Sequence, residues 1–483
     1  MYRYGIVVIG YKKEEGIKRL LHALSFADYD QQDVELIISI DKSEDDKIGD
    51  LANTFQWNFG QKHVILYKER LGLKEHVLRC GDYLNTYDLD AIAVFEDDTM
   101  PSWNFFHFMK AATEKYIEDE NIAGVALHTY CRNFNTHIRK PDAKFAAREW
   151  FVPIMNDGDN CFIQYAQSWG QVWFKRQWNE FREWYAMQDG LESDPLIPKI
   201  VSDWPETSWL KYHIKYCIVK NKYFVYPYLS YATCFTEVGE HTNMQTDDYQ
   251  APLSNIQSKT FKLIDFDDRA LKYDAFFENQ NLYQYCNVNR ADLLVDLYGE
   301  HVETNKRYIL TKKKMAYRVI RSWGDKLVPH EMNLIYDYPG NDIFLYDSFN
   351  AGETVKFPQE SFRKDKMEIY FHILDRWMGM EERGKTLESY FLEKNWKHIA
   401  IYGYGKIGKH MYNRLKNSLV SVDYFIDQNT WICGTETVIK VPTDKLPMVD
   451  AIIITPVLEF GEIAKCLRQR QDCPMVSVED IFE

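Results

Sequence analysis

Short apolar runs and amphipathic segments alternate along the first hundred residues. Each apolar run is bounded by polar residues, which is typical of a strand buried on both faces of a sheet. We predict such strands at 5–9, 34–40, 63–67 and 91–95. Residues 14–25 place their apolar side chains on one helical stripe, and 74–84 forms a second predicted helix. Strands that alternate with helices predict a parallel sheet flanked by helices.

The apolar run at 91–95 leads directly into Glu96, Asp97 and Asp98. Three adjacent carboxylates repel one another, and such clustering is costly unless a cation or a reaction requires it. Open α/β sheets bind ligands at the carboxyl ends of their strands. The pattern therefore predicts a divalent-metal site at this edge, with a solvated acidic turn as the alternative.

After these acids the sequence predicts one more helix, an aromatic-rich region and a region of mixed composition. Pro101 and Ser102 open a further predicted helix, with Ser102 as its N-cap. From about residue 150 to 240 the sequence is rich in Trp and Tyr, which suits either a thick core or a surface on which sugar rings stack. The mixed composition from about 243 to 390 predicts an irregular or helical connecting region.

Residues 306–323 of that region interleave basic with apolar and aromatic side chains. The basic ones are Lys306, Arg307, Lys312, Lys313, Lys314, Arg318 and Arg321. In an acidic protein such a segment suits an anionic membrane surface, so it predicts peripheral membrane contact. The alternative is an ordinary surface helix with its basic side chains pointing outward.

The last ninety residues predict a βαβ unit of their own. A strand at 397–402 leads into Gly403, Gly405 and Gly408, a helix to 415 and a strand that ends at Asp427. Glycines in this context indicate a second nucleotide site. The unit resembles the small Rossmann-like N-terminal domain of bacterial sugar acetyltransferases, and a purely structural or assembly role is the alternative.

Composition narrows the function classes. The 483 residues carry a net charge of −14, which argues against a nucleic-acid partner. The nine cysteines form no C-x-x-C pair, so we expect reduced thiols and a cytoplasmic protein. No apolar run is long enough to predict a membrane span.

The acidic strand end, followed by the segment 100–106, resembles the nucleotide-diphospho-sugar glycosyltransferases of GT-A fold. The resemblance covers about residues 1–245, and the relatives it suggests are N-acetylglucosaminyltransferase I and bacterial enzymes of surface-polysaccharide assembly. Further segments match in order, at 9–13, 39–43, 71–76, 168–173, 226–230 and 239–242.

The resemblance implies a set of donor contacts. The residues expected to meet the donor are Lys12, Lys13, Asp41, His76, Glu96 and Asp97. Asp98 is the expected principal ligand of Mn²⁺ or Mg²⁺, and His241 is expected to ligate the metal or meet a phosphate. Asp41 could instead be a turn acid, His76 a core histidine, and the lysines solvated charges. Relatives carry an arginine in the loop that holds Lys12 and Lys13, which leaves the base contact open.

Inverting sugar transfer needs a general base for the acceptor hydroxyl. Asp203 and Glu206 lie among tryptophans in the segment 202–209. The resemblance favours Asp203 over Glu206 as this base. Alternatively, both acids serve only to stabilise the N-terminus of a helix. The aromatic residues expected on the acceptor side are Trp169, Trp204 and Trp209.

These patterns together predict an α/β protein with a GT-A type, mostly parallel sheet and a small Rossmann-like domain. The predicted domains are 1–245, 246–391 and 392–483. The predicted function is metal-dependent, inverting transfer from a nucleotide sugar to a saccharide hydroxyl, on a lipid carrier or free. We expect it in capsule or other surface-polysaccharide assembly at the inner face of the membrane. A sugar-nucleotide oxidoreductase or epimerase using NAD(P), and a non-catalytic scaffold, are the alternatives. The sequence leaves open whether the transfer inverts or retains the configuration of the sugar, and whether the chain self-associates.

Overall fold

The chain forms two compact units, each described here by itself. Among the residues that the computed structural model describes, the first unit runs to residue 351 and the second begins at 366. The described residues are 2–44, 47–136, 149–191, 196–235, 249–257, 259–301, 305–351, 366–427, 439–440 and 445–482.

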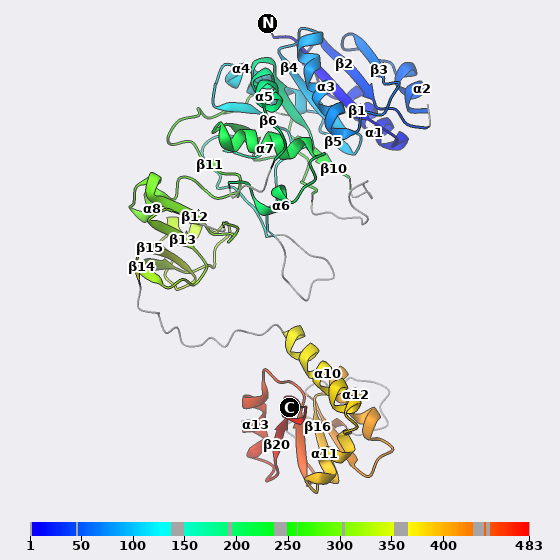
Figure 1. Ribbon diagram of the computed structural model, residues 1–483, viewed down its shortest axis with the longest axis vertical. Coiled ribbons are helices and arrows are strands. Elements are labelled where there is room, and N and C mark those ends of the chain that lie inside the picture. Colours follow the sequence, from blue (N-terminus) through cyan, green and yellow to red (C-terminus); the bar gives the residue numbers. More distant parts are fainter. Residues whose placement is uncertain are drawn as a thin grey trace. The chain divides into compact units, whose positions relative to one another are not determined.

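A nine-stranded sheet is the frame of the first unit, in the order β11-β7-β9-β6-β8-β4-β1-β2-β3 (Figure 1). Its strands are β1 (Tyr4–Gly10), β2 (Val34–Ile40), β3 (Lys62–Leu66), β4 (Ala91–Glu96), β6 (Ile122–Ala126), β7 (Asn160–Ile163), β8 (Gln171–Phe174), β9 (Tyr223–Pro227) and β11 (Lys272–Tyr273). The half from β3 to β4 is parallel throughout, whereas β8 runs antiparallel to both of its neighbours.

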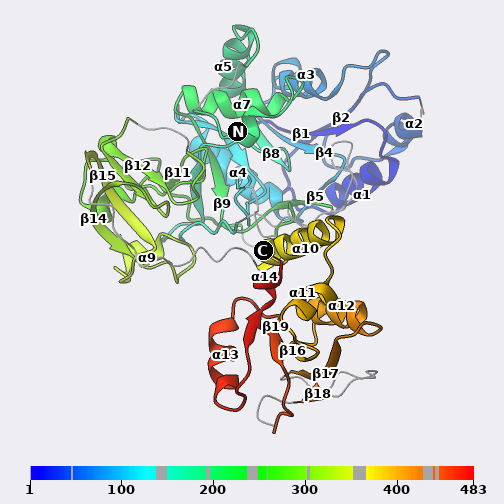
Figure 2. The same ribbon diagram turned by 60° about the horizontal axis from the view of Figure 1, so that its bottom comes forward.

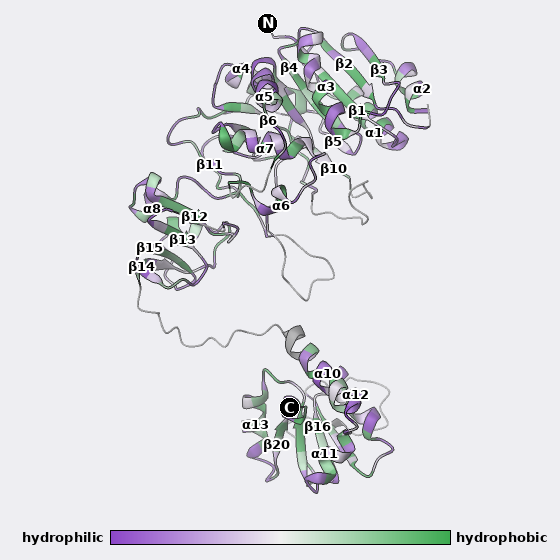
Figure 3. Cartoon of the chain, viewed as in Figure 1, coloured by the Kyte–Doolittle hydropathy of each residue, from purple (hydrophilic) through white to green (hydrophobic). Residues whose placement is uncertain are grey.

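Helices cover both faces of this sheet, because alternate side chains of each buried strand point to opposite sides. The helices are α1 (Glu14–Ser25), α2 (Lys47–Thr54), α3 (Leu73–Thr86), α4 (Phe105–Tyr116), α5 (Lys175–Ala186), α6 (Lys199–Ser202) and α7 (Trp209–Val219). In β1, Val7 and Ile9 join the core under α3, α5 and α7, whereas Ile6 and Val8 join the core under α1, α2 and α4. The central strands are accordingly apolar along their length (Figure 3).

One sequence-predicted helix start is wrong. Residues Thr99–Pro101 form a short strand, β5, that pairs with β10 (Ala232–Cys234). Helix α4 therefore begins only at Phe105, with Asn104 rather than Ser102 at the N-cap position. Ser102 Oγ instead accepts the Asn104 N–H at 3.3 Å. The tertiary strand pair overrides the local capping signal.

A four-stranded sheet follows the large one, in the order β12-β13-β15-β14. Its elements are β12 (Leu293–Asp296), β13 (Tyr308–Thr311), β14 (Tyr317–Trp323), β15 (Ile343–Ala351) and the short helices α8 (Tyr283–Cys286), η1 (Arg290–Asp292) and α9 (Met332–Ile335). The basic-aromatic segment 306–323 thus forms two strands, not a surface helix.

Ion pairs within the unit compensate much of that segment's charge. Arg307 pairs with Asp347 at 3.3 Å, and Lys313 pairs with Asp296 at 2.9 Å. Lys312 pairs with Asp325 and Glu149, and Arg321 pairs with Asp337. Peripheral membrane contact stays a prediction, and these pairs reduce the positive charge that a lipid surface would meet. None of the described helices has the length and apolar character needed to cross a bilayer.

The second unit is a parallel sheet in the order β18-β17-β16-β19-β20. Its elements are α10 (Lys366–Glu382), α11 (Leu387–Glu393), β16 (His398–Tyr402), α12 (Lys406–Leu415), β17 (Ser421–Ile426), β18 (Ile439–Lys440), β19 (Ala451–Ile454), α13 (Phe460–Arg468), β20 (Met475–Ser477) and α14 (Val478–Ile481). Figure 2 shows α13 on one side of this sheet and α11 and α12 on the other. Helices α10 and α11, which both begin before residue 392, share the core of this unit.

The predicted fold class is confirmed: a large, mostly parallel sheet carries helices on both faces, and a smaller parallel sheet follows it. The large sheet extends beyond residue 245, because β11 adds to its edge beside β7.

The core histidine of α7 gives a stability test. The ring of His213 stacks on Phe181 with centroids 4.2 Å apart, and burial lowers its pKa from 6.5 to about 3. Below pH 6.5 the His213 imidazole binds a proton in the unfolded chain but stays neutral in the folded chain. This histidine therefore destabilises the fold as pH falls. When the pH falls from 7 to 5, the free energy of unfolding should decrease in wild type by about 2 kcal/mol more than in His213→Phe.

Urea unfolding followed by tryptophan fluorescence measures this difference. His22→Gln is the matched control, because the His22 side chain is exposed on α1. Equal pH dependence in wild type and His213→Phe would contradict the assignment.

Candidate active site

The carboxyl ends of parallel strands bring the predicted donor residues to one edge of the sheet. β1 pairs in parallel with both β2 and β4, and Ile9 lies opposite Glu96. The loop after β1, Asp41 after β2 and the acids after β4 therefore share this edge. β8 begins at the same edge, because Val94 of β4 pairs with Gln171.

The acidic turn is only partly neutralised. The Lys13 ammonium lies 3.7 Å from Asp97 Oδ1 and 3.7 Å from Asp98 Oδ2. Burial raises the pKa of Asp97 to about 6, against the opposing effect of Lys13. Burial, together with the negative charges of Asp98 and Asp97, also raises the pKa of Glu96. One ammonium beside three carboxyl groups leaves a site that favours a further cation.

One carboxylate oxygen in this turn has no hydrogen bond. Asp98 Oδ1 is buried and has no donor among the described residues. A buried acceptor without a partner costs free energy, so its retention calls for an explanation. A cation ligated by this oxygen would supply the missing interaction.

Close backbone contacts fix the position of the turn. A Cβ added at Gly16 in α1 would lie 2.2 Å from the carbonyl oxygen of Asp97. On the other side, the Phe235 N–H donates to the carbonyl oxygen of Asp98 at 3.1 Å. The acids are thus held between the first turn of α1 and the end of β10.

Asp41 is buried and engaged by backbone. Its Oδ1 accepts the N–H groups of Lys42 and Leu71 at 2.8 Å, and its Oδ2 accepts that of Gly72 at 2.9 Å. Gly72 has φ of 77° and immediately precedes α3, a conformation that favours glycine. In this structure Asp41 therefore positions the loop before α3, and its contact with a donor base stays a prediction.

His76 is also buried, at 2% exposure. Its Nε2 lies 2.8 Å from Ser39 Oγ, which in turn lies 3.0 Å from Tyr83 Oη. Burial lowers the pKa of His76 to about 4, so the imidazole is neutral at physiological pH. Here the ring ties α3 to β2, and its predicted base contact is not tested.

Arg70, which sequence reasoning missed, flanks the loop after β1. The Arg70 guanidinium lies over the Tyr11 ring, 4.8 Å from its centroid, and the exposed Lys12 ammonium lies 5.3 Å from the same centroid. The fold brings Arg70 beside Tyr11 from a segment 59 residues further along the chain, which no local pattern could have indicated.

On the predicted acceptor side, the three tryptophans differ. Trp169 is partly buried and stacks on Tyr249, with centroids 5.2 Å apart. Trp204 is partly buried against the main core. Trp209 is 4% exposed and packs edge-on against Trp173, so its ring is part of the core.

The two candidate bases have different surroundings. Asp203 is 57% exposed and pairs with Lys199 at 2.9 Å on the same helical turn. Glu206 accepts the Tyr212 hydroxyl at 2.6 Å, the buried Lys211 ammonium at 2.9 Å and a backbone N–H at 3.2 Å. Hydrogen bonding by Tyr212 and Lys211 holds the pKa of Glu206 below its usual value.

A chain of contacts connects this acceptor loop to the donor edge. Asp41 holds Gly72, and Lys74, two residues further on, donates to the carbonyl oxygen of Glu206 at 2.7 Å. The loop with the candidate bases is thereby tied to the start of α3.

His241 falls outside the described residues, as do all of 236–248. The described residues on either side, Phe235 and Tyr249, contact the acidic turn and Trp169 respectively. Within the described ranges, His, Cys, Asp and Glu side chains form no group of three that could hold a metal. A cation at Asp98 would thus need further ligands, such as phosphate oxygens and water.

The glycine loop of the second unit is built as its sequence predicts. Gly403 has φ of 98°, and a Cβ at Gly408 would lie 2.2 Å from the carbonyl oxygen of Gly403. Asp427 Oδ2 accepts the Tyr404 N–H at 2.7 Å. Gly405 is at the N-cap of α12, and a Cβ there would meet no atom within 4 Å. The loop is open at the helix N-terminus, and nucleotide binding there stays a prediction.

No model of a known protein family matches the chain, and no curated protein matches it. Among solved structures, TarS 1-349 of S. aureus is similar, with 10% identity and a TM-score of 0.30 over 48% of this chain and 59% of that one. The same fragment in complex with UDP-GlcNAc gives 14% identity and a TM-score of 0.31, over 50% and 60%. The chain spans about three fifths of the length of these fragments. Scores this low support no argument about function.

The contact at Gly16 gives a test of the site's construction. Gly16→Ala places a methyl group against the Asp97 carbonyl, which belongs to backbone and cannot rotate away. We expect a loss of about 1–3 kcal/mol in the free energy of unfolding. Chemical denaturation measures it.

Gly49→Ala in α2 is the control, since its Cβ would meet only the exposed Leu66 side chain, 3.2 Å away. Replacing this helical glycine should change stability by no more than about 1 kcal/mol. Equal effects of the two substitutions would show that the acidic turn is not held by α1.

Proposed function

We propose that the first unit is a GT-A type glycosyltransferase that moves a sugar from a nucleotide-sugar donor to a saccharide hydroxyl. The observation that carries the proposal is the acidic turn at the end of β4, where Asp98 Oδ1 is buried without a hydrogen bond from any described residue. A cation at such a place would stabilise the negative charge of a diphosphate leaving group. The sequence resemblance adds assembly of a bacterial capsule or other surface polysaccharide to the proposal.

The residues at this turn fit Mn²⁺ or Mg²⁺. Carboxylate oxygens are the ligands that these hard cations prefer. Asp98 would hold the metal, with Asp97 beside it and His241 as a further proposed ligand. When bound, the metal would supply positive charge that stabilises the departing nucleoside diphosphate.

Lys13 has a supporting role in this proposal. Its ammonium already lies beside both aspartates, at 3.7 Å from each. It partly offsets their mutual repulsion before a donor binds, and its flexible stem allows it to turn toward a phosphate. Tyr11 and Arg70 form an aromatic and cationic surface next to it, which suits a planar nucleobase.

The surroundings of the two acids support Asp203 as the general base. Tyr212, Lys211 and the Leu191 N–H all donate to the two carboxylate oxygens of Glu206, so this group acts as an anchor for the loop. A carboxylate with a lowered pKa that is already hydrogen-bonded is a weak proton acceptor. Asp203 is exposed, and the partner of its carboxylate among the described residues is the flexible Lys199 of its own helical turn.

Donor binding tests the proposed metal site. We expect UDP or GDP to raise the melting temperature of the full chain only when Mn²⁺ is present, because the diphosphate and Asp98 share the cation. Asp98→Asn should abolish this stabilisation. Asp203→Asn is the control, since it lies outside the metal site and should leave the shift unchanged.

Stabilisation of Asp98→Asn equal to that of wild type would contradict the proposal. Stabilisation by NAD alone would favour the oxidoreductase alternative, and a donor that binds without turnover would favour the scaffold.

The two candidate bases are separated by matched amide substitutions. We expect Asp203→Asn to lower kcat by about 10² or more with unchanged donor binding. Glu206→Gln should instead lower the free energy of unfolding by about 1–2 kcal/mol, because the buried Lys211 ammonium loses its counter-charge. Initial rates of donor consumption and urea unfolding distinguish the two. The reverse outcome would assign the base to Glu206.

A further inference from the structure

Helix α10 of the second unit has two different faces. Ile373, Trp377 and Met380 are 2–6% exposed and pack on the core, where the Trp377 ring stacks on Phe482 with centroids 5.0 Å apart. The opposite face exposes Phe371 at 66% and Met378 at 64%. Large apolar side chains exposed together on one helix face indicate an interaction surface.

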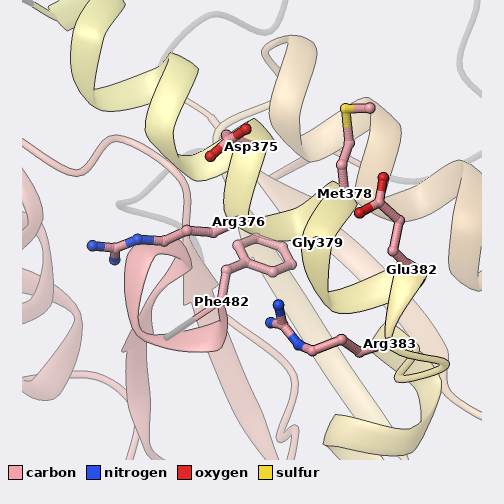
Figure 4. A pocket seen from close by; sticks show the side chains of 7 residues that line it. All are labelled: Asp375, Arg376, Met378, Gly379, Glu382, Arg383 and Phe482. Atoms are coloured by element: carbon pink, nitrogen blue, oxygen red, sulfur yellow. The ribbon is translucent and has the colours of Figure 1, made fainter.

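A groove of about 650 Å³ lies along this face. It is lined by Asp375, Arg376, Met378, Gly379, Glu382, Arg383 and Phe482 (Figure 4). The neighbouring Glu381 is paired with Arg414 at 2.9 Å. By contrast, the four charged groove residues form no ion pair with any described residue. The groove therefore combines exposed apolar surface with charges of both signs that lack counter-charges.

These charges have opposite signs at equal distances from Gly379. Asp375 and Arg383 lie four residues to either side of it, and Arg376 and Glu382 lie three residues to either side. When two copies of a helix pair antiparallel about a two-fold axis, residues equally far on either side of the axis meet. With the axis at Gly379, each acid of one copy meets an arginine of the other.

The middle of this pattern also suits a helix crossing. A Cβ at Gly379 would meet only the end of the Arg383 side chain, 3.3 Å away. The surface beside the glycine is otherwise open, so the backbones of two helices can approach closely there. The Met378 side chains of the two copies would pack next to the axis, with the charged pairs around them.

We propose that this face of α10 docks a second copy of the same chain, in an antiparallel two-fold pair whose axis passes close to Gly379. The surface is complementary to itself in charge, has exposed apolar side chains on the same face and carries a small residue at the crossing. Self-complementarity is the property that a two-fold interface requires.

Sedimentation velocity on the full chain at micromolar concentration tests this pairing. We expect a dimer in wild type. Asp375→Arg and Arg383→Asp each place two pairs of like charges across the axis, so each should raise the dissociation constant about tenfold or more. The double variant exchanges the charges and should restore the dimer. Glu462→Arg, a charge reversal on the exposed surface of α13, should have no effect.

Mixing the two single variants gives the sharpest result, because misfolding cannot explain a rescue. One variant then carries two arginines at these positions and the other carries two aspartates, so equimolar mixing should yield heterodimers. A monomeric wild type would overturn the proposal. A dimer that survives both reversals, or variants that stay monomeric when mixed, would also overturn it.

Discussion

Mutual repulsion of three carboxyl groups at the end of one buried strand is the constraint on which the rest of the first unit depends. β4 carries Glu96 to the edge of the sheet, and Asp97 and Asp98 follow without a spacer. Backbone contacts from α1 and β10 prevent the turn from relaxing into solvent. Lys13 offsets only part of the charge, and Asp98 Oδ1 is buried without a donor in the part of the chain that the structure describes. The fold thus keeps an electrostatically unfavourable arrangement that a cation would relieve.

Much of the frame around this turn could be predicted because its pattern is local. The apolar stripe of α1 and the apolar run of β2 give the observed bounds, 14–25 and 34–40. Prediction failed where a distant segment decides the structure. Ser102 does not cap a helix, because residues 99–101 pair with β10 as a strand and the helix begins only at Phe105. The strands at 308–311 and 317–323 were hidden by basic side chains whose acidic partners lie elsewhere in the sequence.

In the candidate site, too, local features could be predicted from the sequence, whereas contacts between distant segments could not. The acids after β4 are adjacent in sequence, so their clustering was visible without a structure. The hydrogen bonds from Leu71 and Gly72 to Asp41, and the position of Arg70 over Tyr11, join segments thirty or more residues apart. Asp41 and His76 could be selected as residues of this edge, but only the structure shows that both are buried and hold α3 in place. The proposed self-pairing of α10 likewise needed the exposure of each helix face.

Anomalous diffraction from crystals grown with UDP and Mn²⁺ tests the central claim most directly. The account predicts a manganese peak about 2.1 Å from a carboxylate oxygen of Asp98, with diphosphate oxygens completing its coordination. Bound UDP without manganese at Asp98, or manganese bound elsewhere in the molecule, would contradict it.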